Sequence, residues 1–108
     1  MAAMALSNLE TTMQFLVQVS RNPQGPETPP TPAEREVESE TIRHLYRDGV
    51  VRQIWLRDGG AVILAEGSDA QAVGQIFTTL PLVQSGFLDS PTVIALKPYT
   101  GFGPRGGF

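Results

Sequence analysis

The chain has 108 residues, enough for one domain with a core of moderate size. Its 11 acidic and 8 basic residues give a net charge of −3, which argues against nucleic acid as the main partner, because phosphate binding needs a surplus of Lys and Arg. It has no cysteine and a single histidine, His44, which excludes disulfides, zinc–thiolate sites and a multi-histidine metal site within one chain.

No segment predicts an export signal or a membrane-spanning helix. The first ten residues carry no basic residue ahead of their short apolar part. No run approaches the ~20 apolar residues of a membrane helix. We therefore expect a cytoplasmic protein that does not bind a membrane. Residues 1–11 are predicted to form a flexible arm, residues 12–99 a single domain, and residues 100–108 a Gly/Pro-rich tail.

A strand and a surface loop are predicted at the start of the domain. Residues 12–20 are rich in Val, Leu and Phe, and alternation places Phe15, Val17 and Val19 on one face. The prolines within residues 21–30 forbid a helix or a strand there, so this stretch is predicted to be a loop.

A helix is predicted next, because Thr31 and Glu34 form a capping-box pattern around a proline at the first helical position. It should run to Asp48 and stop at Gly49, a residue that tolerates the left-handed backbone of a helix end. Its predicted inner face, by helical spacing, consists of Val37, Thr41, His44 and Leu45.

The second half of the chain predicts three strands and one helix. The expected elements are a strand at 50–57, a hairpin turn at 58–60, a strand at 61–66, a helix from 70 to about 80, an irregular piece at 83–89 and a strand at 92–96. Ser68 or Asp69 is expected to cap this helix, and Pro81 to end or bend it. Its apolar stripe is Val73, Ile76, Phe77 and Leu80.

The order β-α-β-β-α-β predicts an α+β fold of the ferredoxin-like kind, with an antiparallel sheet and both helices on one face. Residues 61–65 and 93–96 are nevertheless apolar on both faces. A bare apolar sheet face would be an aggregation site, so something must cover it. The simplest cover is a second copy of the same sheet, which predicts a homodimer or a higher homo-oligomer.

The first helix carries a candidate acid–base pair. Glu40 and His44 are four residues apart, which places them on neighbouring turns of one face. A carboxylate beside an imidazole can fix its tautomer and raise its basicity, as a proton-transfer site requires. The alternative is a routine ion pair on the helix surface.

Polar side chains on the second strand are candidate ligand contacts. Alternation places Gln53, Trp55 and Arg57 on one face and Arg52 on the other. An arginine in an otherwise apolar space is costly unless it is paired, so Arg52 is a candidate for binding an anionic ligand. The alternative is a guanidinium that reaches water. Trp55 and Tyr46 are expected to be core or interface anchors more than catalysts.

Short motifs resemble two related families. Arg47 and the segment Gly49–Trp55 are similar to the helix-to-strand segment of muconolactone isomerase-like proteins, and Leu80–Leu82 and Met13–Val17 match further parts of that family. The ending Val93–Tyr99 resembles instead the YCII-related proteins of the same superfamily.

The chain departs from both families at specific places. Where YCII-related proteins have a characteristic His–Asp pair, this chain has Glu38 at about the histidine position and Leu80 in place of the aspartate. The hairpin at residues 58–60 is slightly shorter than in muconolactone isomerase-like proteins.

The resemblance implies a dimeric α+β barrel that needs no metal or organic cofactor. It implies a small acidic substrate, often a lactone or a ring-cleaved aromatic compound, and a reaction in which a proton is abstracted and returned. By resemblance, Glu40 would carry the proton and Arg52 would hold a carboxylate or enolate oxygen. The residues themselves add His44 as a partner of Glu40.

The sequence therefore predicts a cofactor-independent isomerase or lyase acting on a small oxygenated ring or lactone-like compound. Its expected catalytic residues are Glu40, His44 and Arg52, and its expected substrate-binding residues are Gln53, Trp55 and Tyr46. We expect them to meet in a cleft between the sheet and the first helix, or on the partner-facing side of the sheet. Two alternatives stay open: a cofactor-free monooxygenase of the related barrel group that uses Trp55, and a ligand-binding or assembly module without catalysis.

Overall fold

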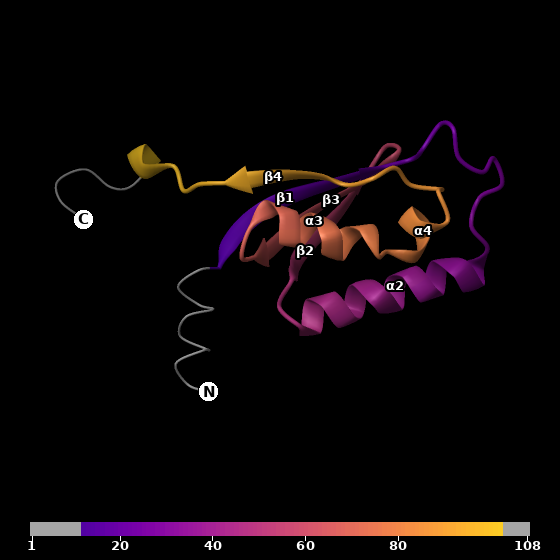
Figure 1. Cartoon of the computed structure of the whole chain (residues 1–108), viewed down its shortest axis with the longest axis horizontal. Helices are drawn as coiled ribbons and strands as arrows, with labels where there is room; N and C mark the ends of the chain where they lie inside the picture. Colours follow the sequence, from indigo (N-terminus) through magenta and orange to yellow (C-terminus); the bar gives the residue numbers. More distant parts are fainter. Residues whose placement is uncertain (1–11, 103–108) are drawn as a thin grey trace.

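The computed structural model describes residues 12–102, in which three α-helices lie on one side of a four-stranded antiparallel sheet (Figure 1). The elements are β1 (Met13–Ser20), α2 (Pro32–Arg47), β2 (Val51–Arg57), β3 (Gly60–Gly67), α3 (Ala70–Thr78), α4 (Pro81–Gln84), β4 (Thr92–Leu96) and the 3₁₀ turn η1 (Thr100–Phe102). The sheet order is β2-β3-β1-β4, which is compatible with the predicted ferredoxin-like arrangement. The predicted arm at residues 1–11 and the end of the tail, residues 103–108, lie outside the described residues.

The core lies between the sheet and α3. The predicted inner face of β1 is confirmed, since Phe15, Val17 and Val19 are all buried. Val17 pairs with Ile63 of β3 on one side and with Val93 of β4 on the other, so β1 is the centre of the apolar layer. The predicted stripe of α3 is confirmed as well: the core cluster contains Phe15, Val17, Val51, Ile63, Ala65, Val73, Phe77 and Leu80, with Ile76 packed against it.

Local sequence signals set the start and end of α2. The Thr31 side chain accepts a hydrogen bond from the Glu34 N–H at 3.1 Å, and the Glu34 carboxylate accepts one from the Thr31 N–H at 2.8 Å. The helix ends at Arg47, one residue before the predicted Asp48, and Gly49 follows with φ of +82°.

The predicted inner face of α2 is confirmed at Leu45 and wrong at Val37 and His44. Val37 is 57% exposed and His44 is exposed, whereas Ile42 and Leu45 are the α2 residues that pack against the core. None of the residues of α2 is fully buried. The helix lies at the margin of the sheet over the outermost strand, so burial does not impose a wide apolar stripe on it.

The end of α3 also differs from the prediction. Asp69, one of the two predicted caps, accepts a hydrogen bond from the Ala72 N–H at 2.8 Å. The helix stops at Thr78 instead of about residue 80, and Pro81 begins the separate short helix α4 in place of a bend. Because proline fits the first turn of a helix, Pro81 starts a new helix as readily as it ends the old one.

The loop between β1 and α2 is held against the α4–β4 connection. The Asn22 N–H donates to the Phe87 carbonyl at 2.9 Å, and its side-chain amide donates to the Gly86 carbonyl at 3.1 Å. Arg21 donates to the Pro26 carbonyl at 2.6 Å and stacks over the Phe87 ring at 4.3 Å from the ring centre. The loop is irregular, as its prolines predict, and its first half is anchored.

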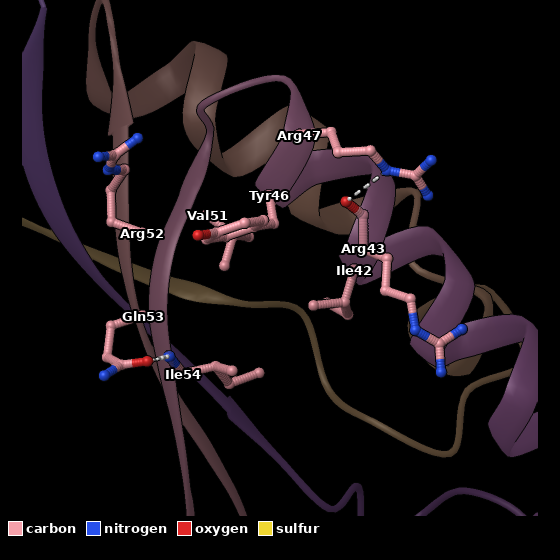
Figure 2. A pocket seen from close by; sticks show the side chains of 8 residues that line it. All are labelled: Ile42, Arg43, Tyr46, Arg47, Val51, Arg52, Gln53 and Ile54. Carbon is pink, nitrogen blue, oxygen red and sulfur yellow. Dashed lines mark hydrogen bonds between the residues drawn. The ribbon is translucent and has the colours of Figure 1, made fainter.

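A β-bulge changes the face on which Arg52 lies. Val51 pairs with Ala65 and Gln53 pairs with Leu64, so that Arg52 is an extra residue between two consecutive positions of β3. The prediction that Arg52 lies opposite Gln53 is wrong: both side chains point away from α2 (Figure 2). Strict alternation fails here because the extra residue of the bulge, Arg52, lies on the same face as the next residue, Gln53.

The sheet face opposite the helices, here called the open face, is mainly apolar at its centre. By the strand register its apolar residues are Leu16, Trp55, Val62, Leu64, Ile94 and Leu96, and the polar residues on the same face are Gln14, Gln18, Gln53, Arg57, Glu66 and Thr92. Trp55 is 51% and Ile94 is 41% exposed. Within residues 12–102, no helix is long and apolar enough to cross a membrane.

Candidate functional site

A pocket of about 440 Å³ lies between α2 and β2. The residues that line it are Ile42, Arg43, Tyr46, Arg47, Val51, Arg52, Gln53 and Ile54. It exists because α2 approaches β2 mainly at its C-terminal end, where the turn at Gly49 joins the two elements. A volume of this size suits a small organic molecule.

The centre of the pocket is apolar and its margins are charged (Figure 2). Ile42 and Tyr46 of α2 and Val51 and Ile54 of β2 point into the space between the helix and the strand. Val51 is buried and belongs to the core, whereas Ile54 is 39% exposed and Tyr46 is 61% exposed. The site therefore has one fixed wall, supplied by the core, and one wall open to solvent.

Arginines border the apolar centre on both sides. Arg43 and Arg47 extend from the side of α2 that faces away from β2, and Arg52 extends from the far side of β2 (Figure 2). Guanidinium groups bind carboxylates through two parallel hydrogen bonds. A ligand with an apolar ring in the centre would meet these guanidinium groups only at the open edge of the pocket, with its carboxylate directed outwards.

The structure brings only part of the predicted site together. Tyr46, Gln53 and Arg52 border the pocket, but Glu40 and His44 do not line it. The Glu40 carboxylate instead lies 3.4 Å from a guanidinium nitrogen of Arg43 and 3.5 Å from one of Arg47.

The expected Glu40–His44 pair is not formed in the structure. His44 is exposed, and the Glu40 carboxylate contacts the guanidinium groups of Arg43 and Arg47 instead. Arginines three and seven residues along the helix from Glu40 offer more donors than a neutral imidazole does.

Trp55 and Arg52 belong to the open face of the sheet. Trp55 pairs with Val62 in the register and is half exposed. The Arg52 guanidinium lies 3.8 Å from the Glu66 carboxylate, which also accepts a hydrogen bond from the Gln14 amide at 3.5 Å. Arg52, Glu66 and Gln14 therefore form a polar cluster at one end of the open face. This cluster lies on the far side of β2 from the apolar centre of the pocket.

One unusual carboxylate escaped the sequence interpretation. Glu38 is half-buried between α2 and α4 and accepts a hydrogen bond from the Leu82 N–H at 3.0 Å. Burial raises the pKa of Glu38 above its ordinary value, against a smaller lowering by the Leu82 hydrogen bond. Its spacing of four residues to Ile42 and of seven to Leu45 was the signal, because it places the three side chains on one helix face, but the charge interrupted the apolar pattern.

Glu38 gives a testable pH dependence of stability. Since its folded-state pKa is raised, the folded protein holds this proton more readily than the unfolded chain, and stability is lost as the pH rises through the folded-state value. We expect Glu38→Gln to be more stable than the wild type at pH 7, because glutamine keeps an acceptor for Leu82 without a buried charge. The gap should close as the pH falls below about 4.3, the ordinary pKa of a glutamate.

Denaturant unfolding at several pH values checks this expectation, and Glu36→Gln is the matched control. A hydrogen bond from Arg43 lowers the pKa of Glu36, so its effect has the opposite sign. Glu36→Gln should lose stability at pH 7 relative to the wild type and approach it in acid. A change in stability of the same sign for both variants at pH 7 would contradict the raised pKa of Glu38.

The chain matches no family model, and no curated protein is significantly similar to it. The site is therefore interpreted from its own geometry and chemistry.

Proposed function

We propose that the protein binds a small carboxylated ring compound in the pocket between α2 and β2 and catalyses a cofactor-independent proton shift on it, as an isomerase or lyase of muconolactone isomerase type. The observation that carries the proposal is the apolar pocket of about 440 Å³ with arginines at its margins. An apolar ring and a carboxylate are the two features that such a lining recognises.

Proton transfer next to a carbonyl needs a base and a donor for the developing oxyanion. Tyr46 points into the pocket, and its phenol is the donor in the proposed reaction. Glu40 is the base. It contacts the two lining arginines, Arg43 and Arg47, at 3.4 and 3.5 Å, which are long distances for charge-assisted hydrogen bonds.

The proposed enzyme is a homodimer in which two sheets pack through their open faces as a dimeric α+β barrel. The exposed Trp55 and Ile94 and the apolar strip of Leu16, Val62 and Leu64 support this assembly, since such a face is unfavourable in water. In the dimer, the cluster of Arg52, Gln53 and Trp55 lies at or near the interface. We propose a cytoplasmic location on the sequence arguments alone.

A second candidate function is ligand binding without catalysis. It is favoured by the composition of the lining, in which no carboxylate or imidazole occurs. The pair Glu40–Arg47 would then be a surface ion pair that contributes less than about 1 kcal/mol to stability.

Turnover of a panel of five-membered unsaturated lactones bearing a carboxylate tests the proposal. We expect a change in ultraviolet absorption without oxygen consumption, and a loss of about 10²–10⁴-fold in kcat for Glu40→Gln. Glu36→Gln removes the same charge one turn earlier and should retain activity. Oxygen consumption would favour the monooxygenase alternative, and binding without turnover of any compound would favour the second candidate.

A further inference from the structure

The arginines at the margin of the pocket are already paired with carboxylates of the same helix. Arg43 contacts Glu36 at 2.8 Å and Glu40 at 3.4 Å, whereas Arg47 contacts Glu40 at 3.5 Å. Across residues 12–102, Glu40 is the one carboxylate within 4.0 Å of Arg47. A ligand carboxylate that approaches Arg47 must therefore compete with the Glu40 carboxylate for the same guanidinium group.

The two arginines differ in how strongly they are held. The short contact between Arg43 and Glu36 gives Arg43 a partner that remains when Glu40 moves. Arg47 has its weaker carboxylate contact and a hydrogen bond from its Nε to the Arg43 carbonyl at 3.4 Å. Its side chain is 60% exposed, so an incoming anion can reach it. Arg47 is thus the guanidinium that a ligand can take over at the lowest cost.

We infer that Glu40 is an internal competitor: it occupies the guanidinium of Arg47 and gives it up when the carboxylate of an acidic ligand binds at the margin of the pocket. The inference rests on the proposed pocket and deepens it, because the exchange frees Glu40 at the moment when a substrate is present. One anion replaces another on Arg47, so no net charge is buried. The ligand class that drives the exchange is a planar apolar acid small enough for the 440 Å³ pocket.

Binding of 2-naphthoate to the full chain tests the exchange, with titration calorimetry at low ionic strength as the readout. We expect Glu40→Gln to bind this probe about twofold to fivefold more tightly than the wild type, the range that a lost surface ion pair corresponds to. Glu36→Gln removes an equal charge from the same helix but releases Arg43 instead of Arg47. It should change the affinity less than Glu40→Gln.

Three further measurements test where and how the effect arises. The neutral probe 2-naphthamide should bind Glu40→Gln and the wild type equally, because it does not compete for Arg47. In amide-resolved spectra, 2-naphthoate should shift the Val51 signal, while the Trp55 indole signal, on the open face, should stay in place. High salt should remove the gain in affinity, since exposed ion pairs are screened.

Equal affinities of Glu40→Gln and Glu36→Gln for 2-naphthoate would overturn the inference, as would the absence of binding to every variant or shifts confined to the open face. Its failure is distinct from that of the proposed reaction. Tighter binding to Glu40→Gln without turnover of any lactone would leave the competition supported and contradict the isomerase. If turnover of a lactone needs Glu40 but Glu40→Gln binds 2-naphthoate no more tightly than the wild type, the isomerase is supported and the competition is contradicted.

Discussion

A charge placed at the centre of the open face, Leu64→Asp, is expected to convert the proposed dimer to a monomer. Leu64 pairs with Leu16 on β1 and with Gln53 on β2, so it lies in the middle of the apolar strip. In the proposed dimer the carboxylate would be buried against the partner's apolar residues without a counter-ion, which costs several kcal/mol. Light scattering at micromolar concentration measures the change in mass.

The matched control is Leu56→Asp. Leu56 is on the neighbouring strand, is 88% exposed and pairs with Ala61, which places it on the helix side of the sheet. This substitution should leave the dimer intact. Thermal unfolding of both variants separates dissociation from loss of the fold. A wild-type chain that is monomeric at micromolar concentration, or a Leu64→Asp variant that stays dimeric, would contradict the proposed assembly.

The parts of the fold that local chemistry controls could be predicted. The capping box of Thr31 and Glu34, the turn at Gly59 with φ of +77°, and the alternation of β1 each need only neighbouring residues. The end of α3 at Thr78 could not be predicted, because Leu80 is buried by tertiary packing although it lies beyond the helix.

The position of the candidate site was predicted better than its composition. A cleft between the sheet and the first helix is present, and Tyr46 points into it, whereas Arg52 and Gln53 border it from the far side of β2. The bulge that turns Arg52 away from α2 leaves no mark in the alternation of the strand, since an extra residue is recognised only against its partner strand. The apolar residues Ile42 and Val51 were not singled out, because apolar side chains in a small domain more often form core than a binding site.

Glu40 shows why a spacing rule did not identify its partner. The interval of four residues to His44 permits contact, but it permits the contact with Arg43 at three residues equally well. The choice depends on the number of donors and on the permanent charge of the guanidinium, which favours arginine over a neutral imidazole. Counting the competing partners on the same helix face would have predicted the observed pair.

Truncation of Phe77 to alanine is expected to destabilise the protein by about 3–5 kcal/mol, the usual cost of removing a fully buried aromatic ring. Phe77 is on α3, is 0% exposed and belongs to the same cluster as Phe15 and Val51. Since Val51 is also the fixed wall of the pocket, the cavity should loosen that wall and weaken 2-naphthoate binding in the fraction that stays folded. Denaturant unfolding measures the free energy, and Leu56→Ala, at a position 88% exposed, should change it by no more than about 0.5 kcal/mol. A loss below about 1 kcal/mol for Phe77→Ala would contradict the described core, because removal of a fully buried ring that packs α3 on the sheet should cost more than that.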